Sequence, residues 1–259
     1  MIRILGILNL TPDSFYAPSR TAPGDVVSVA SGMMADGAWA LDLGAVSTRP
    51  GSAPVSSAEE WTRLEPALVA LRDLECRISV DTFRSEIVSR VYDTVGPFIV
   101  NDITAGASDP SMLPMVGRLG LPYIAMHLHG NPFSPSETPG DVVEDVLSYF
   151  RSFSLRAADA GVADWILDPG FGFSKTLEQN WDLLYRLSEL QCLGRPVLAG
   201  ISRKSMLWKR FGITPADALP ATQAAHMLAL QGSATYLRVH DVAAAAQTAA
   251  IFEGGRPGA

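Results

Sequence analysis

Asp81, Asn101, Asp168 and Lys204 have the side chains needed to recognise a flat polar ring, and each follows a short apolar segment. Two carboxylates and an amide offer donors and acceptors to the edge of a heterocycle. One carboxylate can accept two parallel N–H bonds from an amino-amide edge like that of guanine or a pterin. A lysine beside them would bind a ring carbonyl or nitrogen and keep the carboxylates ionised. An internal ion pair between Lys204 and Asp168 is the structural alternative.

Arg49, Arg238 and His240 have the composition of an anion-binding site. Arg238 and His240 are two residues apart in a segment that predicts a strand, so both side chains face the same side. Arg49 follows two hydroxyl residues in a predicted loop. Arginine suits bidentate contacts with phosphate, and Asn9, after the first apolar segment, is expected to reach the same phosphate or a Mg²⁺ bound to it. Taken singly, each arginine could instead be an ordinary surface cation.

Eight short aliphatic or β-branched segments predict the strands that would carry these residues. They are residues 3–10, 38–44, 76–82, 97–102, 121–128, 164–169, 196–202 and 234–240. Stretches with a 3.6-residue apolar period lie between them and predict helices over residues 58–74, 142–160, 177–190 and 215–231. Continuous apolar strands that alternate with helices indicate a parallel sheet covered on both faces.

Eight such units in 259 residues predict a single (β/α)₈ barrel. A doubly wound sheet usually has fewer strands and a nucleotide-binding loop after the first. No linker or low-complexity tract divides the chain, so residues 1–259 are expected to form one domain, with residues 131–140 as a long exposed loop. Nearly every predicted strand ends in a polar residue, at the end where barrel active sites lie. A turn or cap role explains any one of these residues but not the whole set.

Composition and charge exclude several classes of protein. The 20 Lys and Arg residues against 27 Asp and Glu residues give a net charge of −7, and the absence of a basic run argues against a nucleic-acid partner. Apolar residues form 47% of the chain, too many for a disordered tail. Cys76 and Cys192 form no C-x-x-C pair, so no disulfide framework or Cys-rich zinc site is expected. With no signal-peptide core and no apolar stretch of about 18 residues, a cytoplasmic protein without membrane association is expected.

Two further motifs admit a catalytic interpretation that their surroundings do not favour. His127-Leu128-His129 has the spacing of the metal-binding H-x-H pair of barrel hydrolases, but those enzymes carry the pair on the first strand and have more histidines than the four here. The segment 170–176 resembles a phosphate-binding glycine loop but lacks the glycine before its lysine that a Walker A motif requires. This segment is expected to present Phe171 and Phe173 beside an aromatic ligand, unless both are core residues. Ser174 or Thr176 would cap the next helix.

Motifs along nearly the whole chain resemble, in order, those of the dihydropteroate synthase family. They are ILNLTPDSF at 7–15, DLGAVSTRPG at 42–51, SVDT at 79–82, NDI at 101–103, MH at 126–127, LDPGFGF at 167–173, SRKS at 202–205 and RVHDV at 238–242. The resemblance implies a barrel enzyme that condenses a dihydropterin methyl pyrophosphate with p-aminobenzoate. The products would be dihydropteroate and pyrophosphate, with Mg²⁺ assisting.

The resemblance also implies roles for individual residues. The pterin would be bound by Asp81, Asn101, Met126, Asp168, Gly200 and Lys204. The pyrophosphate would be bound by Asn9, Arg49, Arg238 and His240, with Asn9 also a ligand of Mg²⁺. The p-aminobenzoate would lie among Ser47, Thr48, Pro50, Phe173 and Ser205. The residues closest to the chemistry would be Arg49, Lys204, Arg238 and His240.

Two departures from the family pattern concern the first two loops. The family often continues Ser-Asp-Gly-Gly after Phe15, but this chain has Tyr-Ala-Pro-Ser, with Ala17 in place of the acidic residue, and Val46 stands where many members carry Glu. Both bear on loop closure. A pterin-dependent methyltransferase would share the ring-binding residues but has no use for the anion-binding set, and a non-catalytic pterin-binding paralogue would bind without turnover. The Ala-rich segments 216–230 and 242–252 predict apolar surface suited to a homodimer.

Overall fold

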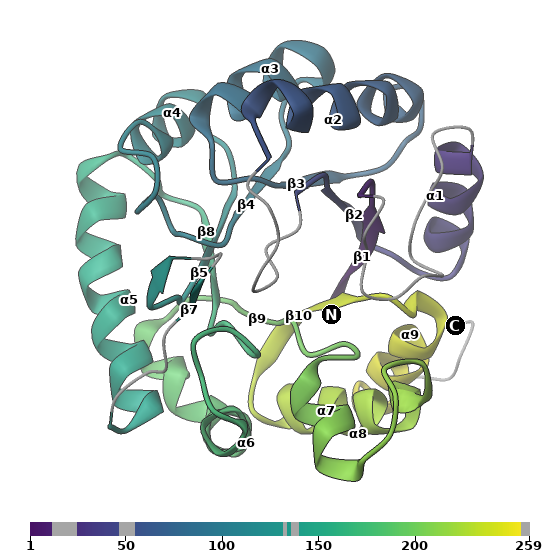
Figure 1. Ribbon diagram of the computed structural model, residues 1–259, viewed down its shortest axis with the longest axis vertical. Coiled ribbons are helices and arrows are strands. Elements are labelled where there is room, and N and C mark those ends of the chain that lie inside the picture. Colours follow the sequence, from purple (N-terminus) through teal and green to yellow (C-terminus); the bar gives the residue numbers. More distant parts are fainter. Residues whose placement is uncertain (12–24, 47–54, 132–133, 136–139, 255–259) are drawn as a thin grey trace.

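The computed structural model describes residues 1–11, 25–46, 55–131, 134–135 and 140–254. Its main sheet is a closed barrel of parallel strands, which confirms the predicted (β/α)₈ fold (Figure 1). The order around the ring is β1 (Arg3–Asn9), β10 (Ala234–Val239), β9 (Val197–Ala199), β8 (Trp165–Asp168), β5 (Tyr123–Met126), β4 (Ile99–Asp102), β3 (Ile78–Asp81) and β2 (Ala40–Gly44). Because the strands all run the same way, their carboxyl ends meet at one mouth of the barrel.

Helices occupy the outside of the ring in Figure 1. They are α1 (Val26–Ala35), α2 (Ser57–Leu71), α3 (Ser85–Val95), α4 (Met112–Leu119), α5 (Val142–Asp159), α6 (Leu177–Tyr185), α7 (Ser205–Phe211), α8 (Leu219–Gln231) and α9 (Val242–Phe252). The predicted helix 177–190 is shorter than expected, because Arg186 leaves the helical region at φ −106° and ψ 15° and a 3-10 segment, η3 (Leu187–Leu193), follows. The predicted helix 215–231 begins with the 3-10 turn η4 (Ala216–Ala218).

Apolar side chains alternate between the two faces of the strands and form two layers. Those that point outward, such as Ile4 and Leu41, pack against the helices. Those that point inward fill the barrel and are Leu5, Ala40, Ile99, Ile124, Ile166, Leu198 and Tyr236. The inward residues come from the start or middle of their strands. The polar groups at the strand ends therefore lie above a packed floor.

The loop between β8 and α6 ends in a capping box at the start of α6. Thr176 Oγ1 accepts a hydrogen bond from Gln179 N at 3.1 Å, and Gln179 Oε1 accepts one from Thr176 N at 2.9 Å. Thr176, and not Ser174, is therefore the cap of this helix. In the expected loop 131–140, the described backbone forms a small antiparallel ladder between β6 (Gly130–Asn131) and β7 (Ser134–Pro135).

Candidate functional site

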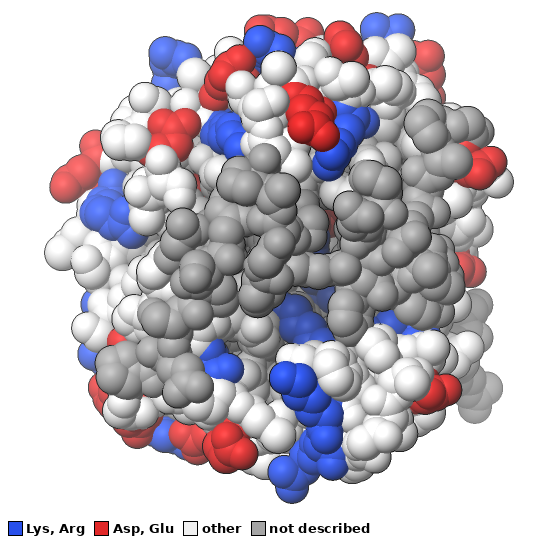
Figure 2. Space-filling model, in the orientation of Figure 1, with Lys and Arg blue, Asp and Glu red and all other residues white. Residues whose placement is uncertain are grey.

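Polar residues from several strands gather at the carboxyl mouth of the barrel. In the strand register, Asp81 at the end of β3 pairs with Gly44 of β2 on one side and with Asn101 of β4 on the other. Asp168 at the end of β8 is level with Met126 of β5. Figure 2, in the orientation of Figure 1, shows basic side chains near the centre of this face and most of the visible acidic side chains around its edge. Strand register therefore brings the predicted carboxylates and amide to one mouth.

Arg238 on β10 joins the polar groups of two neighbouring strands. Its Nε donates to Asp42 Oδ2 at 2.6 Å, and its Nη2 donates to Asp81 Oδ2 at 3.0 Å. Asp42 is completely buried and also accepts from Asn101 Nδ2 at 3.2 Å and from Ser79 Oγ at 2.5 Å. The Arg238 side chain therefore points into the mouth, and its orientation is fixed by protein groups.

Lys204, directly before α7, enters the mouth from the side of β9. Its Nζ donates to the carbonyl oxygen of Phe171 and lies 4.7 Å from the centroid of the Phe173 ring. A Cβ placed on Gly200 would lie 3.7 Å from both Asp168 Oδ2 and Lys204 Nζ. Lys204 thus bonds a backbone carbonyl. Among the described residues it does not form the internal ion pair with Asp168 that was the structural alternative. Gly200 keeps the region between carboxylate and ammonium clear of a side chain.

An apolar wall borders the space beside Lys204. The wall consists of Phe83, Ile103, Met126 and Leu128, with Val46 and Phe173 packed against them. Phe171, in contrast, is fully buried in the core that faces the helices. The expectation that both phenylalanines face a ligand is therefore wrong for Phe171. Gly170 and Gly172 have φ values of 72° and 78°, so the side-chain alternation of the strand does not continue through this turn.

His240 and Asn9 lie at the ends of the two strands that close the barrel. His240 N donates to Ser202 Oγ at 3.2 Å, and His240 Nδ1 lies 3.0 Å from the same oxygen. Asn9 is level with Gly44, and a Cβ placed on that glycine would lie 3.6 Å from Asn9 Oδ1 and 3.9 Å from Asp81 Cβ. Gly44 therefore puts no side chain between the Asn9 amide and Asp81.

Burial changes the protonation of the groups in the mouth. It raises the pKa of Asp81 to about 7 although Arg238 opposes the shift, and it raises the pKa of Asp168 against the opposing charge of Lys204. Burial lowers the pKa of Lys204 to about 8. It also lowers the pKa of His240 to about 3, with a contribution from Arg238. The His240 imidazole is therefore neutral at neutral pH, and the lysine and the arginine supply the positive charge.

Comparison with known proteins identifies the family. A family model described as "Pterin binding enzyme" matches residues 5–240. The chain belongs to the pterin binding enzyme family. It is 39% identical over 256 residues to the dihydropteroate synthase of Escherichia coli, and the alignment covers 96% of this chain and 90% of that protein.

Two solved structures resemble the whole of this pterin binding enzyme. A Yersinia pestis dihydropteroate synthase in complex with a sulfonamide drug gives a TM-score of 0.92 at 34% identity, covering 98% of this chain and 94% of that one. A Thermus thermophilus dihydropteroate synthase in complex with 4-aminobenzoate gives a TM-score of 0.87 at 38% identity, with the same coverage of 98% and 94%. The family resemblance inferred from the motifs is confirmed.

The sequence predicted no binding or catalytic role for three residues that support the mouth of this pterin binding enzyme: Asp42, Lys175 and Arg203. Lys175 Nζ donates to the carbonyl oxygen of Phe173 at 3.2 Å and so fixes the turn that carries this ring. Arg203 donates to both carboxylate oxygens of Asp241 at 2.7 and 2.9 Å and joins the segments that follow β9 and β10. Asp42 lies within β2, and Lys175 and Arg203 lie in the segments that follow β8 and β9. Nothing local in the sequence indicates their roles, because their partners are distant along the chain or set by the turn.

Some predicted residues lie outside the described part of the chain. These are Ser47, Thr48, Arg49 and Pro50, together with Ala17 of the first departure from the family pattern. Ser205 is the first residue of α7 and directly follows Lys204. Val46, the second departure, packs an apolar side chain against the apolar wall beside Lys204.

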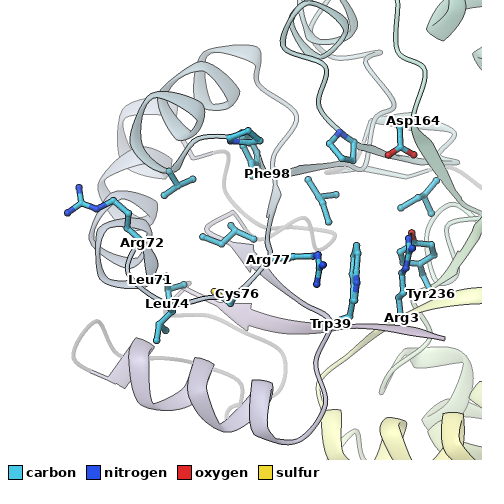
Figure 3. A pocket seen from close by; sticks show the side chains of 16 residues that line it. Arg3, Trp39, Leu71, Arg72, Leu74, Cys76, Arg77, Phe98, Asp164 and Tyr236 are labelled. Atoms are coloured by element: carbon cyan, nitrogen blue, oxygen red, sulfur yellow. The ribbon is translucent and has the colours of Figure 1, made fainter. Parts of the chain in front are cut away.

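A cavity of about 400 Å³ opens at the opposite mouth of the barrel, near the beginning of the strands (Figure 3). Arg3 and Arg77 lie over the Trp39 ring there, with their guanidinium carbons 4.8 and 5.0 Å from its centroid. Among its described lining residues, none belongs to the polar group at the strand ends. The candidate active site is therefore the carboxyl mouth, where barrel enzymes carry their catalytic groups.

Proposed function

We propose that this enzyme is a dihydropteroate synthase. It is a transferase that condenses 6-hydroxymethyl-7,8-dihydropterin pyrophosphate with p-aminobenzoate to form 7,8-dihydropteroate and pyrophosphate. The observation that carries the proposal is one mouth that combines Asp81, Asn101, Asp168 and Lys204 with Arg238. Similarity to dihydropteroate synthases over nearly the whole chain supports it. The same similarity does not favour a pterin-dependent methyltransferase or a non-catalytic pterin-binding paralogue.

The pterin ring would be bound by polar groups along its edge and by an apolar wall. The proposed residues are Asp81, Asn101, Met126, Asp168, Gly200 and Lys204. Asp168 Oδ1 accepts from Gly170 N at 2.8 Å, which orients the carboxylate with Oδ2 toward Gly200. An amino-amide edge placed there would donate two parallel hydrogen bonds to the carboxylate. Lys204 would then donate to a ring carbonyl or nitrogen.

The pyrophosphate would be bound by Arg238 and His240, together with Asn9 and Arg49. Burial alone would lower the pKa of Arg238, but the adjacent Asp42 and Asp81 raise it, so the guanidinium stays ionised. A cation that is already fixed in place stabilises the charge that develops on a leaving group without reorganising. The neutral His240 imidazole contributes a hydrogen bond rather than a charge.

The reaction requires orientation and charge stabilisation more than a strong base. The amine nitrogen of p-aminobenzoate bonds to the methylene carbon and gives up a proton to water. The bond from that carbon to the pyrophosphate oxygen breaks, and its electron pair leaves with the pyrophosphate. The electron-rich dihydropterin stabilises the developing positive charge. Because an aromatic amine is a competent nucleophile, the protein chiefly orients it. The residues proposed to surround it are Ser47, Thr48, Pro50, Phe173 and Ser205.

Mg²⁺ fits the residues present, and Asn9 is its proposed protein ligand. Mg²⁺ prefers oxygen ligands and commonly uses one or two protein groups together with phosphate oxygens of the substrate. Asn9 Oδ1 lies at the end of β1, across Gly44 from Asp81, and so borders the proposed pyrophosphate site. When bound, Mg²⁺ would neutralise part of the pyrophosphate charge.

Turnover by the purified protein tests the proposed function. With the pterin pyrophosphate, p-aminobenzoate and Mg²⁺, the protein is expected to form dihydropteroate and pyrophosphate in equal amounts. Asp168→Asn should weaken pterin binding and turnover together, whereas Asp182→Asn, at an exposed carboxylate on α6, should change neither. Pterin binding without release of pyrophosphate would support the non-catalytic paralogue instead.

The proposed partners are the two small-molecule substrates and a second copy of the chain, in the cytoplasm. Ile251 and Phe252 of α9 are 69% and 40% exposed, which offers apolar surface to a homodimer. Cys76 and Cys192 are free thiols, which fits a reducing compartment. Within the described residues, no helix has the length and apolar character to cross a bilayer. Light scattering coupled to gel filtration is expected to give the mass of a dimer.

A further inference from the structure

His127, His129 and Asp145 form a cluster that the proposed reaction does not use. The two histidines follow β5, and Asp145 lies in the first turn of α5. Asp145 Oδ2 is 2.7 Å from His129 Nε2 and 2.9 Å from His127 Nε2. One ligand atom from each of the three residues lies within 4.8 Å of the other two. The H-x-H spacing noted in the sequence therefore has a third partner that the sequence did not indicate.

His127 is held with one ring nitrogen directed into this cluster. Its side chain is 0% exposed, and its Nδ1 lies 3.0 Å from Lys175 Nζ on the other side of the ring. The Tyr149 ring packs edge-on against it, with centroids 4.9 Å apart. Although Asp145 Oδ2 is close, its direction does not make a hydrogen bond, so His127 Nε2 is a buried nitrogen without a hydrogen-bond partner among the described residues. Such an atom aimed at a carboxylate and a second imidazole suits a metal ligand. Metal binding at Nε2 places the imidazole hydrogen on Nδ1, toward Lys175 Nζ, and so releases one proton from this pair to solvent.

We propose that His127, His129 and Asp145 bind a divalent transition-metal ion such as Zn²⁺ through His127 Nε2, His129 Nε2 and Asp145 Oδ2. Two imidazole nitrogens and one carboxylate oxygen are a ligand set that Zn²⁺ accepts, with water in the fourth position, whereas Mg²⁺ prefers oxygen ligands alone. The side chains of His129 and Asp145 are 34% and 22% exposed, so the ion can reach the cluster from solvent.

The ligand atoms must shift to accept the ion, because the two imidazole nitrogens lie within 4.8 Å of each other and must come to about 3.3 Å. Tetrahedral ligands about 2.0 Å from Zn²⁺ lie about 3.3 Å from one another. The two nitrogens are 2.9 and 2.7 Å from Asp145 Oδ2, so each distance must open by a few tenths of an ångström. His127 is confined by its neighbours, and the partly exposed His129 and Asp145 are the groups that move.

The site would be structural rather than catalytic, and it is distinct from the proposed Mg²⁺ site. Asn9 lies on β1, and four places in the ring separate β1 from β5. A bound ion would connect the end of β5 to α5. Through the contact of His127 with Lys175, it would also support the turn that carries Phe173. This inference does not depend on the proposed function.

Metal titration of the full chain, after treatment with a chelator, tests the site. Calorimetry with Zn²⁺ is expected to give one ion per chain with micromolar or tighter affinity, and Co²⁺ is expected to give the visible absorption of a four-coordinate nitrogen and oxygen site. The thermal unfolding temperature should rise with the concentration of free Zn²⁺. No saturable binding, or sulfur-to-metal charge transfer that indicates cysteine ligands, would overturn the proposal.

Variants at the two partly exposed ligands separate this cluster from other metal-binding groups. His129→Asn and Asp145→Asn are each expected to lower Zn²⁺ affinity at least tenfold and to remove the Co²⁺ spectrum. Glu144→Gln, at the exposed neighbour of Asp145 on the same helix, should bind as the unmodified chain does. Unchanged affinity in both ligand variants would overturn the proposal. Circular dichroism without metal checks that the variants fold, and the buried His127 is left intact for that reason.

Discussion

At the scale of single residues, two carboxylates in the mouth hold Arg238 in a fixed position. Asp42 and Asp81 each accept a hydrogen bond from Arg238, and Asp42 also binds Asn101. Burying ions is unfavourable unless they are paired and hydrogen-bonded. Asp42 therefore acts by positioning Arg238 and Asn101, and these two side chains are oriented before a ligand arrives.

Replacing Arg238 tests its proposed contact with the leaving group. Arg238→Ala is expected to lower kcat by roughly 100-fold or more, because removing one preorganised charge-stabilising donor costs on the order of 3 kcal/mol in the transition state. Pterin affinity should fall less. Rapid-quench measurement of pyrophosphate release, with pterin binding by calorimetry, separates the two effects. A variant with normal pyrophosphate release would remove Arg238 from this role.

Lys204 is expected to act on pterin affinity instead. Lys204→Ala should weaken pterin binding roughly tenfold to a hundredfold, the range for a hydrogen bond to a charged group. Because burial lowers the pKa of Lys204 to about 8, the ammonium persists below that pH, and affinity should decline as the pH rises through it. Calorimetry from pH 7 to 9 measures this, with Lys209→Ala at an exposed lysine of α7 as the control. Equal affinities for the two variants would contradict the assignment.

At the scale of elements, the turn between β8 and α6 decides which side chains enter the mouth. Gly170 N binds Asp168, and a Cβ on Gly170 would lie 2.1 Å from the carbonyl oxygen of His127 at the end of β5. The turn therefore depends on backbone from two neighbouring strands coming into close contact. Only glycine allows both this approach and the φ of 72°.

Gly170→Ala tests the importance of that contact. The substitution adds both a steric clash and an unfavourable φ, so we expect a loss of about 3 kcal/mol or more in the free energy of unfolding. Gly194→Ala is the control, since Gly194 has the left-handed φ of 62° and ψ of 24° but no atom within 4 Å of an added Cβ. It should cost about 1 kcal/mol. Urea unfolding of both variants gives the comparison, and equal losses would mean that the contact with His127 is unimportant.

The elements also show where prediction from sequence ends. The strands were predicted because each is a continuous apolar run, and Asp81, Asn101 and Asp168 because parallel strands end at one mouth. Phe171 was misplaced because two glycines with positive φ reset the direction of side chains after β8. The partners of Asp42 and His127 were not predicted because Arg238 and Asp145 meet them only when the barrel has formed.

At the scale of the whole molecule, three of the four histidines resist protonation, and two of them, His127 and His226, are fully buried. Burial lowers the pKa of His127 to about 2, of His240 to about 3 and of His226 to about 4. The unfolded chain would bind protons at these residues near pH 6.5. Each histidine therefore stabilises the fold above that pH and loses its contribution as the pH falls toward the folded pKa.

His226 isolates this effect, because it belongs to the helix α8, is 0% exposed and has no proposed role in binding or catalysis. Between pH 7.5 and pH 5, the free energy of unfolding should fall by about 2 kcal/mol more for the unmodified chain than for His226→Gln. The reason is that His226 binds a proton in the unfolded state of the unmodified chain but not in its folded state. Buried carboxyl groups with a raised pKa make the fold more stable as the pH falls. Because both proteins contain them, this contribution cancels in the comparison. Urea unfolding at the two pH values measures the difference, and a parallel decline in both proteins would rule out His226 as its source.

Pairing of β1 with β10 closes the ring, and it joins segments more than two hundred positions apart in the chain. During synthesis the backbone groups on one edge of β1 therefore stay unpaired until β10 has left the ribosome. A polypeptide that stopped before Ala234 would expose open edges on β1 and β9, which invite aggregation. It would also lack Arg238, so closure of the sheet and delivery of the anion-binding arginine occur in the same late event.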